Sequence, residues 1–339
     1  MTMKVGLIGV GYWGPNLLRT LRASRRCELV HIADKDSERR AFAAAAAPEA
    51  LVSESAEALL EDPEIQAVVI ATPAASHFDL VMQALSHGKH ILVEKPMARS
   101  SAEVRTIGEA ATASGLVAMV GHTFLYNDAV RHLRSLIHSG ELGAVRYIFG
   151  QRLNLGRIRS DVDALWNFGP HDISIIQYLL DEPAALTVSR TGMDYVQPGI
   201  DDVVFLHIEY PEKVMAHLHL SWLDPHKVRR MTVVGTKKMA VYDDTAEYKI
   251  AVYDKGIDPK AELGQTMDYD ESARGFLLRS GDVQFPKIAF REPLRVEIDH
   301  WLDCILDGDD CLTGPEHAEN VLNILERASN HSIYDPSDA

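Results

Sequence analysis

The sequence predicts an α/β protein in which an amino-terminal, doubly wound parallel sheet precedes an α+β domain with a large, mostly antiparallel open sheet. Three observations indicate this. A glycine-rich turn follows the first apolar stretch, short all-apolar strands then alternate with helical patterns as far as residue 122, and period-two strands dominate the rest. The 339 residues suffice for about two domains. We expect a dinucleotide-binding domain at 1–122 and a second domain at 123–339.

The first strand, at residues 4–10, leads into the sequence GVGYWG at residues 9–14. In a dinucleotide-binding turn, Gly9 permits the tight turn, Gly11 lets the backbone approach a pyrophosphate, and Gly14 lets the next helix pack closely. The helix that follows carries Pro15 in its first turn, and its amino end would face the phosphates. The strand before the motif and the helix after it strengthen a short motif that is weak alone.

A second strand, at residues 28–33, ends at Asp34, which lies 20 residues after Gly14. This is the interval expected for a carboxylate that binds the adenosine ribose hydroxyls. The charge of Asp34 would repel a 2′-phosphate, so the sequence favours NAD over NADP. Lys35, Arg39 and Arg40 follow closely and act in the opposite direction.

The remaining elements of the first domain alternate between strand and helix. Strands are expected at 67–71, 91–93 and 116–121, and helices at 37–47, 54–60, 78–86 and 101–114. This alternation implies parallel strands joined by right-handed crossovers.

Lys95 stands directly after a buried strand in the sequence Glu94-Lys95-Pro96. Proline cannot donate a ladder hydrogen bond, so the strand stops there. Lys95 then lies at the carboxyl end of a strand, where open α/β sheets bind ligands. It is either a reactive amine or an ordinary surface lysine. Three residues follow the neighbouring strand at the same edge, where the dinucleotide should cross: Thr72, Pro73 and His77.

The second half reads as strands at 145–153, 185–190, 203–210, 214–222, 228–234 and 238–242, with helices at 127–139, 295–306 and 315–329. Short connections between strands indicate hairpins and hence an antiparallel sheet. Residues 255–284 receive no assignment.

The sequence WNFGPHD at residues 166–172 opens an amphipathic helical pattern. Pro170 suits the first turn of that helix. If the preceding turn is also helical, Asn167 and His171 share one face. Alone, His171 is more often a capping or core histidine than a catalytic residue.

Three arginines, Arg152, Arg157 and Arg159, stand just before this segment. They form either a solvated loop or an anion clamp, because guanidinium groups match phosphate and carboxylate geometry.

Composition excludes several partners. The formal net charge is −15, from 34 basic and 49 acidic residues, which disfavours nucleic acid and anionic membranes. The 3 cysteines are scattered, so neither disulfides nor a metal site is indicated. We see no signal peptide and no apolar run of about 18 residues, and expect a cytoplasmic protein.

These motifs, in this order, resemble the glucose–fructose oxidoreductase/inositol dehydrogenase (Gfo/Idh/MocA) family over nearly the whole chain. The resemblance implies an NAD(P)-dependent oxidoreductase of sugars or cyclitols with a Rossmann domain. The family lysine matches Lys95 and the family histidine matches His171. The residues expected to bind cofactor are Gly9, Gly11, Tyr12, Trp13, Gly14, Asp34, Lys35, Thr72, Pro73, His77, Glu94 and Lys95. Those expected to bind substrate are Arg152, Arg157, Arg159, Asn167 and His171.

One position departs from the family pattern, which often has Asp four residues before the histidine where this chain has Asn167. An amide orients a hydroxyl but supplies no charge, so a three-member proton relay is in doubt, and Lys95 and His171 are left as the acid–base candidates. Residues 152–156 and 166–172 look most like the branch of UDP-N-acetylglucosamine and UDP-N-acetylglucosaminuronate 3-dehydrogenases. The alternatives are a free-sugar or inositol dehydrogenase and a non-catalytic dinucleotide-binding regulator. Family resemblance also implies that residues 123–339 form a substrate-binding and oligomerisation domain. Its sheet should have an exposed face, and the protein should be a homodimer or homotetramer.

Overall fold

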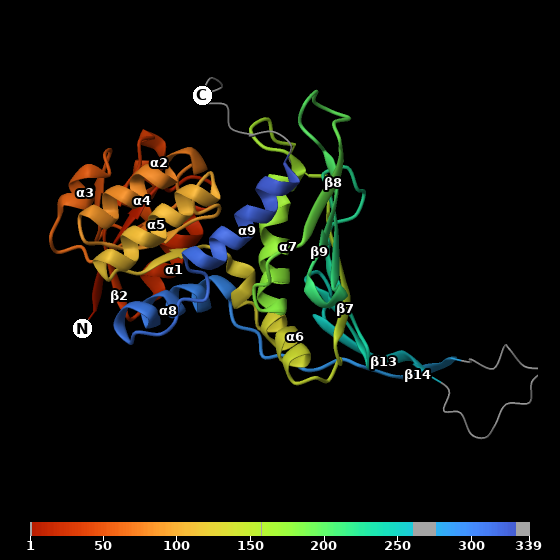
Figure 1. Cartoon of the computed structure of the whole chain (residues 1–339). Helices are drawn as coiled ribbons and strands as arrows, with labels where there is room; N and C mark the ends of the chain where they lie inside the picture. The colour runs from red at the N-terminus through yellow and green to blue at the C-terminus, as the bar shows by residue number, and fades with distance from the viewer. Residues whose placement is uncertain (1, 157, 260–275, 330–339) are drawn as a thin grey trace, which may run out of the picture. The chain divides into compact units, whose positions relative to one another are not determined.

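The computed structural model describes residues 2–156, 158–259 and 276–329. Arg157, one of the expected anion ligands, lies outside the described residues. The chain divides into two compact units. Unit 1 comprises Met1–Asn127 and Arg291–Ala339, and unit 2 comprises Asp128–Phe290. Figure 1 shows the chain and labels several of its helices and strands.

Unit 1 contains a six-stranded sheet in the order β3-β2-β1-β4-β5-β6, and every neighbouring pair is parallel. Its strands are β1 (Met3–Ile8), β2 (Cys27–Ala33), β3 (Leu51–Ser53), β4 (Ala67–Ile70), β5 (His90–Val93) and β6 (Ala118–Val120). The doubly wound parallel sheet is confirmed. The sequence missed β3, a three-residue edge strand whose Leu51 is exposed, because it buries too little apolar surface to leave a pattern.

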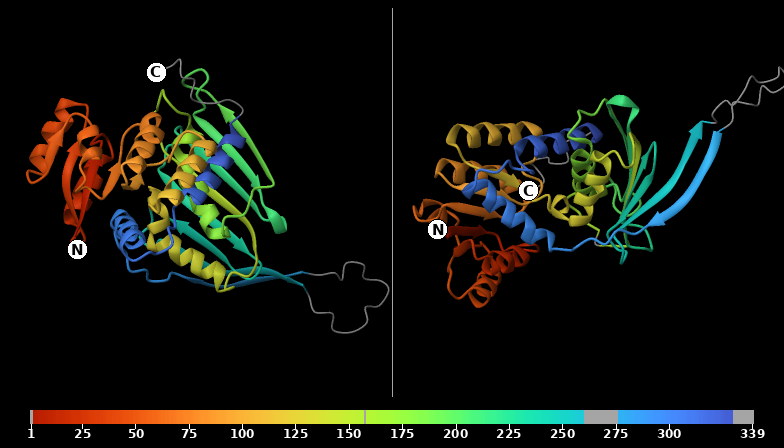
Figure 2. Two further views of the ribbon diagram at one scale, coloured as in Figure 1. Left: turned by 60° about the vertical axis from the view of Figure 1, so that its left-hand side comes forward. Right: turned by 90° about the horizontal axis from the view of Figure 1, so that it is seen from below.

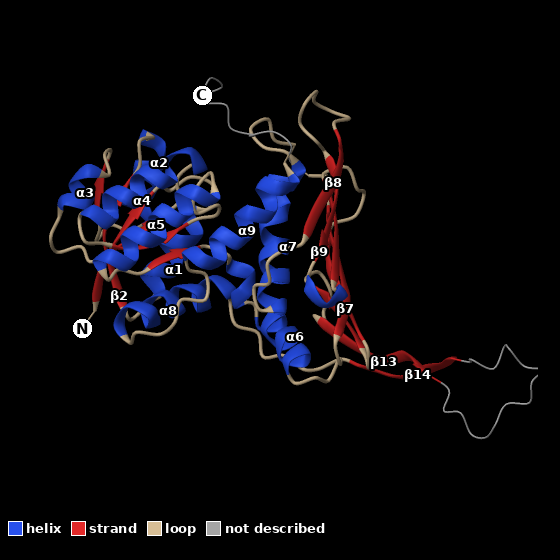
Figure 3. Cartoon of the chain, in the orientation of Figure 1, coloured by secondary structure: helices blue, strands red, loops and turns tan. Residues whose placement is uncertain are grey.

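Helices cover both faces of this sheet (Figure 3). They are α1 (Gly14–Ala23), α2 (Ser37–Ala46), α3 (Glu57–Glu61), η1 (Ala74–Ser76), α4 (His77–Ser86), α5 (Ser101–Ser114) and η2 (Thr123–Tyr126). The chain moves from β1 to β2 in one direction and from β4 to β5 in the other. Right-handed crossovers therefore place α1 and α4 on opposite faces.

The two carboxy-terminal helices, α8 (Pro293–Leu306) and α9 (Pro315–Ala328), belong to unit 1. Helix α8 packs against α1 and η2, and α9 packs against α5. The buried Trp301 indole donates to the Ile91 carbonyl at 3.1 Å, which ties α8 to β5. The sequence analysis instead assigned these helices to the second domain. A change of pattern near residue 122 cannot show that the carboxy-terminal part of the chain packs back onto unit 1.

Unit 2 contains an eight-stranded sheet in the order β14-β13-β12-β11-β7-β10-β9-β8. Its strands are β7 (Val145–Leu153), β8 (Thr187–Met193), β9 (Val203–Glu209), β10 (Met215–Ser221), β11 (Val228–Gly235), β12 (Met239–Asp243), β13 (Ile250–Pro259) and β14 (Phe276–Gln284), with η3 (Pro211–Lys213) between β9 and β10. All neighbours are antiparallel except β7 and β10. The mostly antiparallel sheet is confirmed. The unassigned stretch contains the end of β13 and all of β14, while 260–275 lie outside the described residues.

The helices of unit 2, α6 (Asp128–His138) and α7 (Ala164–Leu180), pack on one face of this sheet. Figure 2 shows both from two further sides. Alternation along the strands explains the asymmetry. Ile148 and Leu218 are fully buried on the helix side, whereas their neighbours Tyr147 and Phe205, on the other side, are more than two-fifths exposed.

Candidate active site

The glycine-rich turn between β1 and α1 is sterically fixed at two of its three glycines. Gly9 has a φ of +94°, and a Cβ there would lie 2.7 Å from the Ala71 carbonyl oxygen. A Cβ at Gly14 would lie 2.6 Å from the Gly9 carbonyl oxygen. At Gly11, none of the described residues comes within 4 Å of such a Cβ. Gly9 and Gly14 therefore pack closely against neighbouring backbone. The backbone at Gly11 stays accessible, as pyrophosphate binding requires.

Asp34 connects the end of β2 to this turn. Its carboxylate accepts hydrogen bonds from the backbone N–H groups of Val10, at 2.6 Å, and Asp36, at 2.9 Å. A carboxylate has about four acceptor positions, so capacity remains for ribose hydroxyls. Arg40 turns inward, because its guanidinium donates to the carbonyls of Asp34, at 2.9 Å, and Lys35, at 2.8 Å. Arg40 is thus committed to the protein, while Arg39 is exposed.

Tyr12 and Trp13 are exposed aromatic side chains within the turn, at 88% and 38%. Apolar rings left in solvent beside a phosphate-binding turn are available to cover a bound ligand. Both were expected among the cofactor-binding residues.

His77 is buried and supports two strand-end loops. Its Nε2 lies 2.8 Å from the Thr72 carbonyl oxygen and its Nδ1 lies 2.7 Å from the Pro96 carbonyl oxygen. Burial lowers its pKa, although both carbonyl contacts oppose this. With 1% exposure and both nitrogens engaged, His77 holds the segment after Lys95 against the loop after β4. His77 was expected to bind the cofactor, but its ring contacts two backbone carbonyls, which indicates a supporting role.

Glu94 and Lys95 leave the carboxyl end of β5. The Lys95 backbone N–H donates to Glu94 Oε2 at 3.2 Å. A Cβ on Gly121 would lie 3.3 Å from the Glu94 carboxyl, so a larger residue at 121 would crowd this carboxyl. Burial raises the pKa of Glu94 to about 7, and the Lys95 charge limits the rise. The lysine therefore has an acid beside it that titrates near neutrality.

Asn167 and His171 lie in one helix of unit 2. Helix α7 begins at Ala164, where the Asp163 side chain caps it by accepting from Trp166 N at 2.9 Å. The two residues are four apart and share a helix face, as predicted. Pro170 was expected in the first turn, and this is wrong. It lies inside the helix, since the capping Asp163 starts the helix earlier than the apolar pattern indicated.

Arg152 and Asp172 form a buried ion pair between β7 and α7. Arg152 Nε lies 2.6 Å from one carboxylate oxygen and Nη2 lies 3.1 Å from the other. Both residues are at most 5% exposed. Arg152 was expected in an anion clamp, but its guanidinium is enclosed and bound to Asp172. Arg159 pairs with Asp161 at the surface, so its side chain stays accessible to solvent.

A further group around η2 was missed by the sequence analysis. Glu297, Thr123, His122 and His317 are all in unit 1, and Glu297 is 1% exposed. The available signal was the position of Glu297 between the apolar residues Val296 and Ile298, four residues before Trp301. It was overlooked because most helical acids are solvated.

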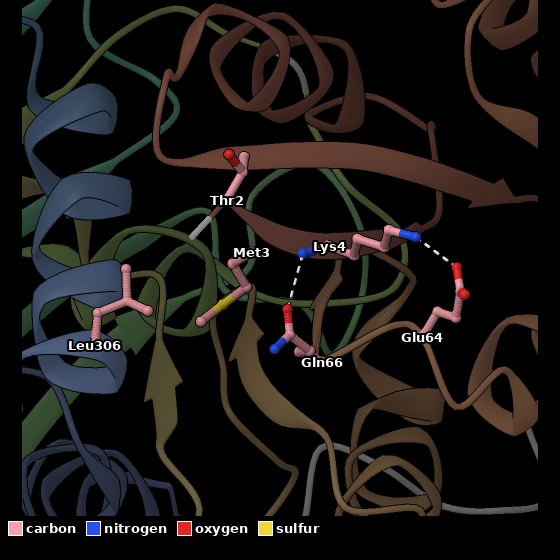
Figure 4. Close-up of a pocket in the computed structure, with 6 residues that line it drawn as sticks. All are labelled: Thr2, Met3, Lys4, Glu64, Gln66 and Leu306. Carbon is pink, nitrogen blue, oxygen red and sulfur yellow. Dashed lines mark hydrogen bonds and ion pairs between the residues drawn. The ribbon is translucent and has the colours of Figure 1, made fainter.

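The hollow in Figure 4 lies at the opposite edge of the unit 1 sheet from the glycine turn. It is lined by Thr2, Met3, Lys4, Glu64, Gln66 and Leu306. Lys4 donates from its backbone to Gln66 at 3.1 Å and pairs with Glu64 through its ammonium group. Amino ends of strands are not where α/β sheets bind ligands. Within the described residues, no cluster of potential metal ligands occurs, and no helix is long and apolar enough to span a bilayer.

The fold and the glycine turn define a dinucleotide-binding protein with a second, sheet-based unit. Residues 3–122 match the family model "Oxidoreductase family, NAD-binding Rossmann fold", and residues 130–241 match "GFO/IDH/MocA C-terminal domain". The chain belongs to the Gfo/Idh/MocA oxidoreductase family, as the resemblance indicated.

Among curated relatives, inositol 2-dehydrogenase 2 of Saccharopolyspora erythraea is 29% identical over 65% of this chain and 67% of its own length. An uncharacterized oxidoreductase of Streptococcus pneumoniae is 28% identical, and the match covers 64% of this chain and 62% of that protein. Among solved structures, UDP-N-acetylglucosamine 3-dehydrogenase of Acidithiobacillus ferrooxidans has a TM-score of 0.79 at 24% identity, with 97% of each chain covered. GenD2 from gentamicin A biosynthesis, solved with NAD, has a TM-score of 0.79 at 24% identity and covers 96% of this chain and 93% of its own. At these identities the structures establish the fold.

Proposed function

We propose that this protein is an NAD-dependent oxidoreductase that transfers a hydride between a secondary alcohol of a sugar and nicotinamide. The observation that carries the proposal is the arrangement of unit 1. A closed glycine turn and Asp34 stand at the carboxyl edge of the same sheet from which Glu94 and Lys95 emerge. Family membership and the inositol dehydrogenase relative support the reaction class.

Each candidate residue has a separate proposed role in the reaction. Bound NAD⁺ would accept the hydride, and the residues that fit it are those of the glycine turn and Asp34. The alcohol proton needs a positioned base, and Lys95 and His171 are the candidates. An unperturbed histidine titrates near ~6.5, within the range a base needs, whereas lysine near ~10.4 requires a tuned environment. Asn167 would orient a substrate hydroxyl.

We propose NAD rather than NADP as the cofactor. Asp34 presents a carboxylate where the ribose hydroxyls are expected, and Arg40 is held by backbone carbonyls. A 2′-phosphate would therefore meet a negative charge with Arg40 turned away from it.

We propose a nucleotide-linked sugar, oxidised at its 3-position, as the substrate class. Support comes from the resemblance of residues 152–156 and 166–172 to the UDP-sugar branch and from the surface position of Arg159. The second candidate is a free sugar or inositol, which the inositol 2-dehydrogenase relative favours. The third is a dinucleotide-binding regulator without catalysis, which Asn167 favours.

A substrate panel tests these candidates directly. Purified protein is incubated with NAD⁺ or NADP⁺ and, separately, UDP-N-acetylglucosamine, UDP-N-acetylglucosaminuronate, free N-acetylglucosamine and myo-inositol, and NAD(P)H formation is followed. We expect NADH with a UDP-sugar. Faster turnover of inositol would select the second candidate. Tight NADH binding without turnover of any of a broad set of sugars would select the regulator.

We propose that the working form is a homodimer or homotetramer. The face of the unit 2 sheet away from α6 and α7 exposes Tyr147, Phe205 and Met215 by 41–44%. The His217 ring stacks between Phe149 and Phe205 on that face, at centroid distances of 5.7 and 6.1 Å. An ordered apolar surface of this kind is typical of an interface between copies. The cytoplasmic location stays a prediction.

A further inference from the structure

The fold brings Cys304 and Cys311 to one histidine. Cys304 lies in the last turn of α8, four residues after His300, and its Sγ lies 3.4 Å from His300 Nε2. The chain then turns back, and the backbone N–H of Leu312 donates to the same nitrogen at 3.1 Å. One imidazole nitrogen therefore contacts the thiol of Cys304 and the peptide group that follows Cys311.

This arrangement places a base beside the Cys304 thiol. Because Nε2 of His300 accepts the Leu312 N–H, this nitrogen carries a lone pair and the ring proton is on Nδ1. The thiol of Cys304 therefore faces an acceptor, which is how an adjacent base activates a cysteine as a nucleophile.

The two thiols are also coupled to each other. Both are free, and a hydrogen bond between their side chains lowers the pKa of Cys304 and raises that of Cys311. Burial and Asp309 oppose the lowering at Cys304, whereas His300 adds to it. One thiol thus ionises more readily than usual beside another that keeps its proton, as an attacking and a resolving thiol require.

Packing holds the loop between α8 and α9 in place. Thr313 is fully buried, its carbonyl accepts from the Val120 N–H, and its hydroxyl contacts the Tyr126 hydroxyl, both at 2.9 Å. These bonds fix the loop to β6 and η2. Cys311 is half-buried and Cys304 is 5% exposed, so the pair is open to an oxidant as small as hydrogen peroxide.

We propose that Cys304 and Cys311 are a peroxide-reactive thiol pair that closes into a disulfide within unit 1. Cys304 is the attacking thiol, His300 takes its proton, and Cys311 is the resolving thiol. The disulfide joins the end of α8 to the loop before α9. The inference does not depend on the proposed dehydrogenase activity, and its test needs neither substrate nor cofactor.

The reaction uses one hydrogen peroxide and two thiols. The sulfur of Cys304 bonds to one peroxide oxygen, the O–O bond breaks, and the other oxygen leaves as water with the proton held by His300. Cys304 is then a sulfenic acid. The sulfur of Cys311 bonds to that of Cys304, the S–O bond breaks, and hydroxide leaves as water with the Cys311 proton. The thiols lose two electrons in total, and the peroxide is reduced to two waters.

Cys27 is a matched internal control. It lies on β2 in the same unit and is also 5% exposed. Its thiol faces the Leu21 carbonyl oxygen at 3.7 Å rather than a base, and burial raises its pKa. We therefore expect Cys27 to react with peroxide much more slowly than the pair.

Mass spectrometry measures this difference. Reduced protein is treated with hydrogen peroxide, denatured, alkylated with iodoacetamide and digested with trypsin, which leaves both cysteines of the pair on one peptide, 296–327. This peptide should become lighter by two hydrogens, carry no alkyl group, and return to the alkylated form after dithiothreitol. It should react about tenfold faster than Cys27 or more, since one pKa unit changes the thiolate fraction about tenfold. Equal rates, a disulfide between two chains, or sulfinic acid without a disulfide would overturn the proposal.

Three variants assign the roles. In Cys311→Ser, the sulfenic acid of Cys304 should accumulate and be labelled by dimedone, whereas in Cys304→Ser, Cys311 should stay reduced. His300→Gln keeps an acceptor for the Leu312 N–H but no base, and should slow closure about tenfold. Labelling of Cys311 at the wild-type rate in Cys304→Ser, or an unchanged rate in His300→Gln, would overturn the corresponding role. Thermal unfolding checks that the variants are folded, and if one is not, the wild-type comparison with Cys27 still decides.

Discussion

Arg152 and Asp172 form a two-point ion pair inside unit 2, and Asp172 directly follows His171 in helix α7. The pair joins β7, in the middle of the eight-stranded sheet, to the helix that holds the candidate acid–base residue. Burial opposes the charge of Arg152, yet Asp172 still raises its pKa. The pair therefore fixes the helix turn that carries His171, and its role is structural.

The first prediction concerns the contribution of this ion pair to the stability of the protein. Arg152→Met leaves the Asp172 charge buried without its partner, and breaking such a pair costs about 3–5 kcal/mol. We expect a loss of this size in the free energy of unfolding measured with urea. The double variant Arg152→Met/Asp172→Leu should recover most of it. The exposed pair Arg159–Asp161 is the matched control, and Arg159→Met should cost about 0–1 kcal/mol. Equal costs at the two sites would contradict the assignment.

The second prediction concerns the acid–base residues. Lys95→Ala and His171→Ala should each lower kcat about 10²–10⁴-fold, the contribution of a positioned acid–base group. In His171→Ala, the NAD⁺ affinity measured by fluorescence quenching should change much less than kcat, because the glycine turn and Asp34 belong to unit 1. His138→Ala, a half-exposed histidine paired with Asp181, is the control. Near-full activity in both test variants would remove these residues from the mechanism.

The third prediction concerns cofactor choice. Asp34→Asn removes the charge that would bind ribose hydroxyls and repel a 2′-phosphate. A hydrogen bond to a charged group is worth roughly 1.5–3 kcal/mol, so NAD⁺ affinity should fall about ten- to a hundredfold. NADP⁺ affinity should rise or stay level. Calorimetric titration with both nucleotides measures this, and Asp36→Asn, on the neighbouring helix cap, is the control. Tighter binding of NADP⁺ than of NAD⁺ by wild type would show that Arg39 dominates.

The fourth prediction concerns assembly. Light scattering at micromolar concentration should give a multiple of the 37.6 kDa chain mass. Phe205→Asp places a charge on the exposed aromatic face and should shift the protein toward a single chain. Leu51→Asp changes an exposed apolar side chain in unit 1 and should leave the mass unchanged. A wild-type mass of one chain would refute the oligomer.

The sequence sufficed for most of the fold because apolar period and turn chemistry are local signals. The strands that lead into Asp34 and Lys95 could be placed, and Asn167 and His171 could be put on one helix face. Pro170 was placed too early in its helix because the capping side chain, Asp163, lies outside the apolar pattern. The return of α8 to unit 1 is a long-range event, and no local pattern encodes it.

The candidate site shows the same difference between local and long-range signals. Candidate residues that belong to a local motif, such as Gly9, Gly11 and Lys95, could be named from the sequence. Residues whose role depends on a partner far along the chain could not. Arg152 reads as a solvated cation until Asp172 is seen beside it, and Glu297 reads as a surface acid until Thr123 is seen beside it. Burial distinguishes these cases, and burial comes from tertiary packing.

The last prediction concerns substrate charge. If Arg159 holds the diphosphate or carboxylate of a nucleotide sugar, Arg159→Ala should raise the KM for UDP-N-acetylglucosamine about ten- to a hundredfold, since a charged hydrogen bond is worth roughly 1.5–3 kcal/mol. The KM for NAD⁺ should be nearly unchanged. Asp161 binds the Arg159 guanidinium and competes with an anionic substrate. Asp161→Asn should therefore lower the KM for the UDP-sugar, the opposite of the arginine variant. Arg230→Ala, an exposed arginine on β11, is the control for net charge. If neither variant changes the KM, or if both raise it equally, Arg159 is not the anion ligand, and a neutral sugar or inositol becomes the better substrate.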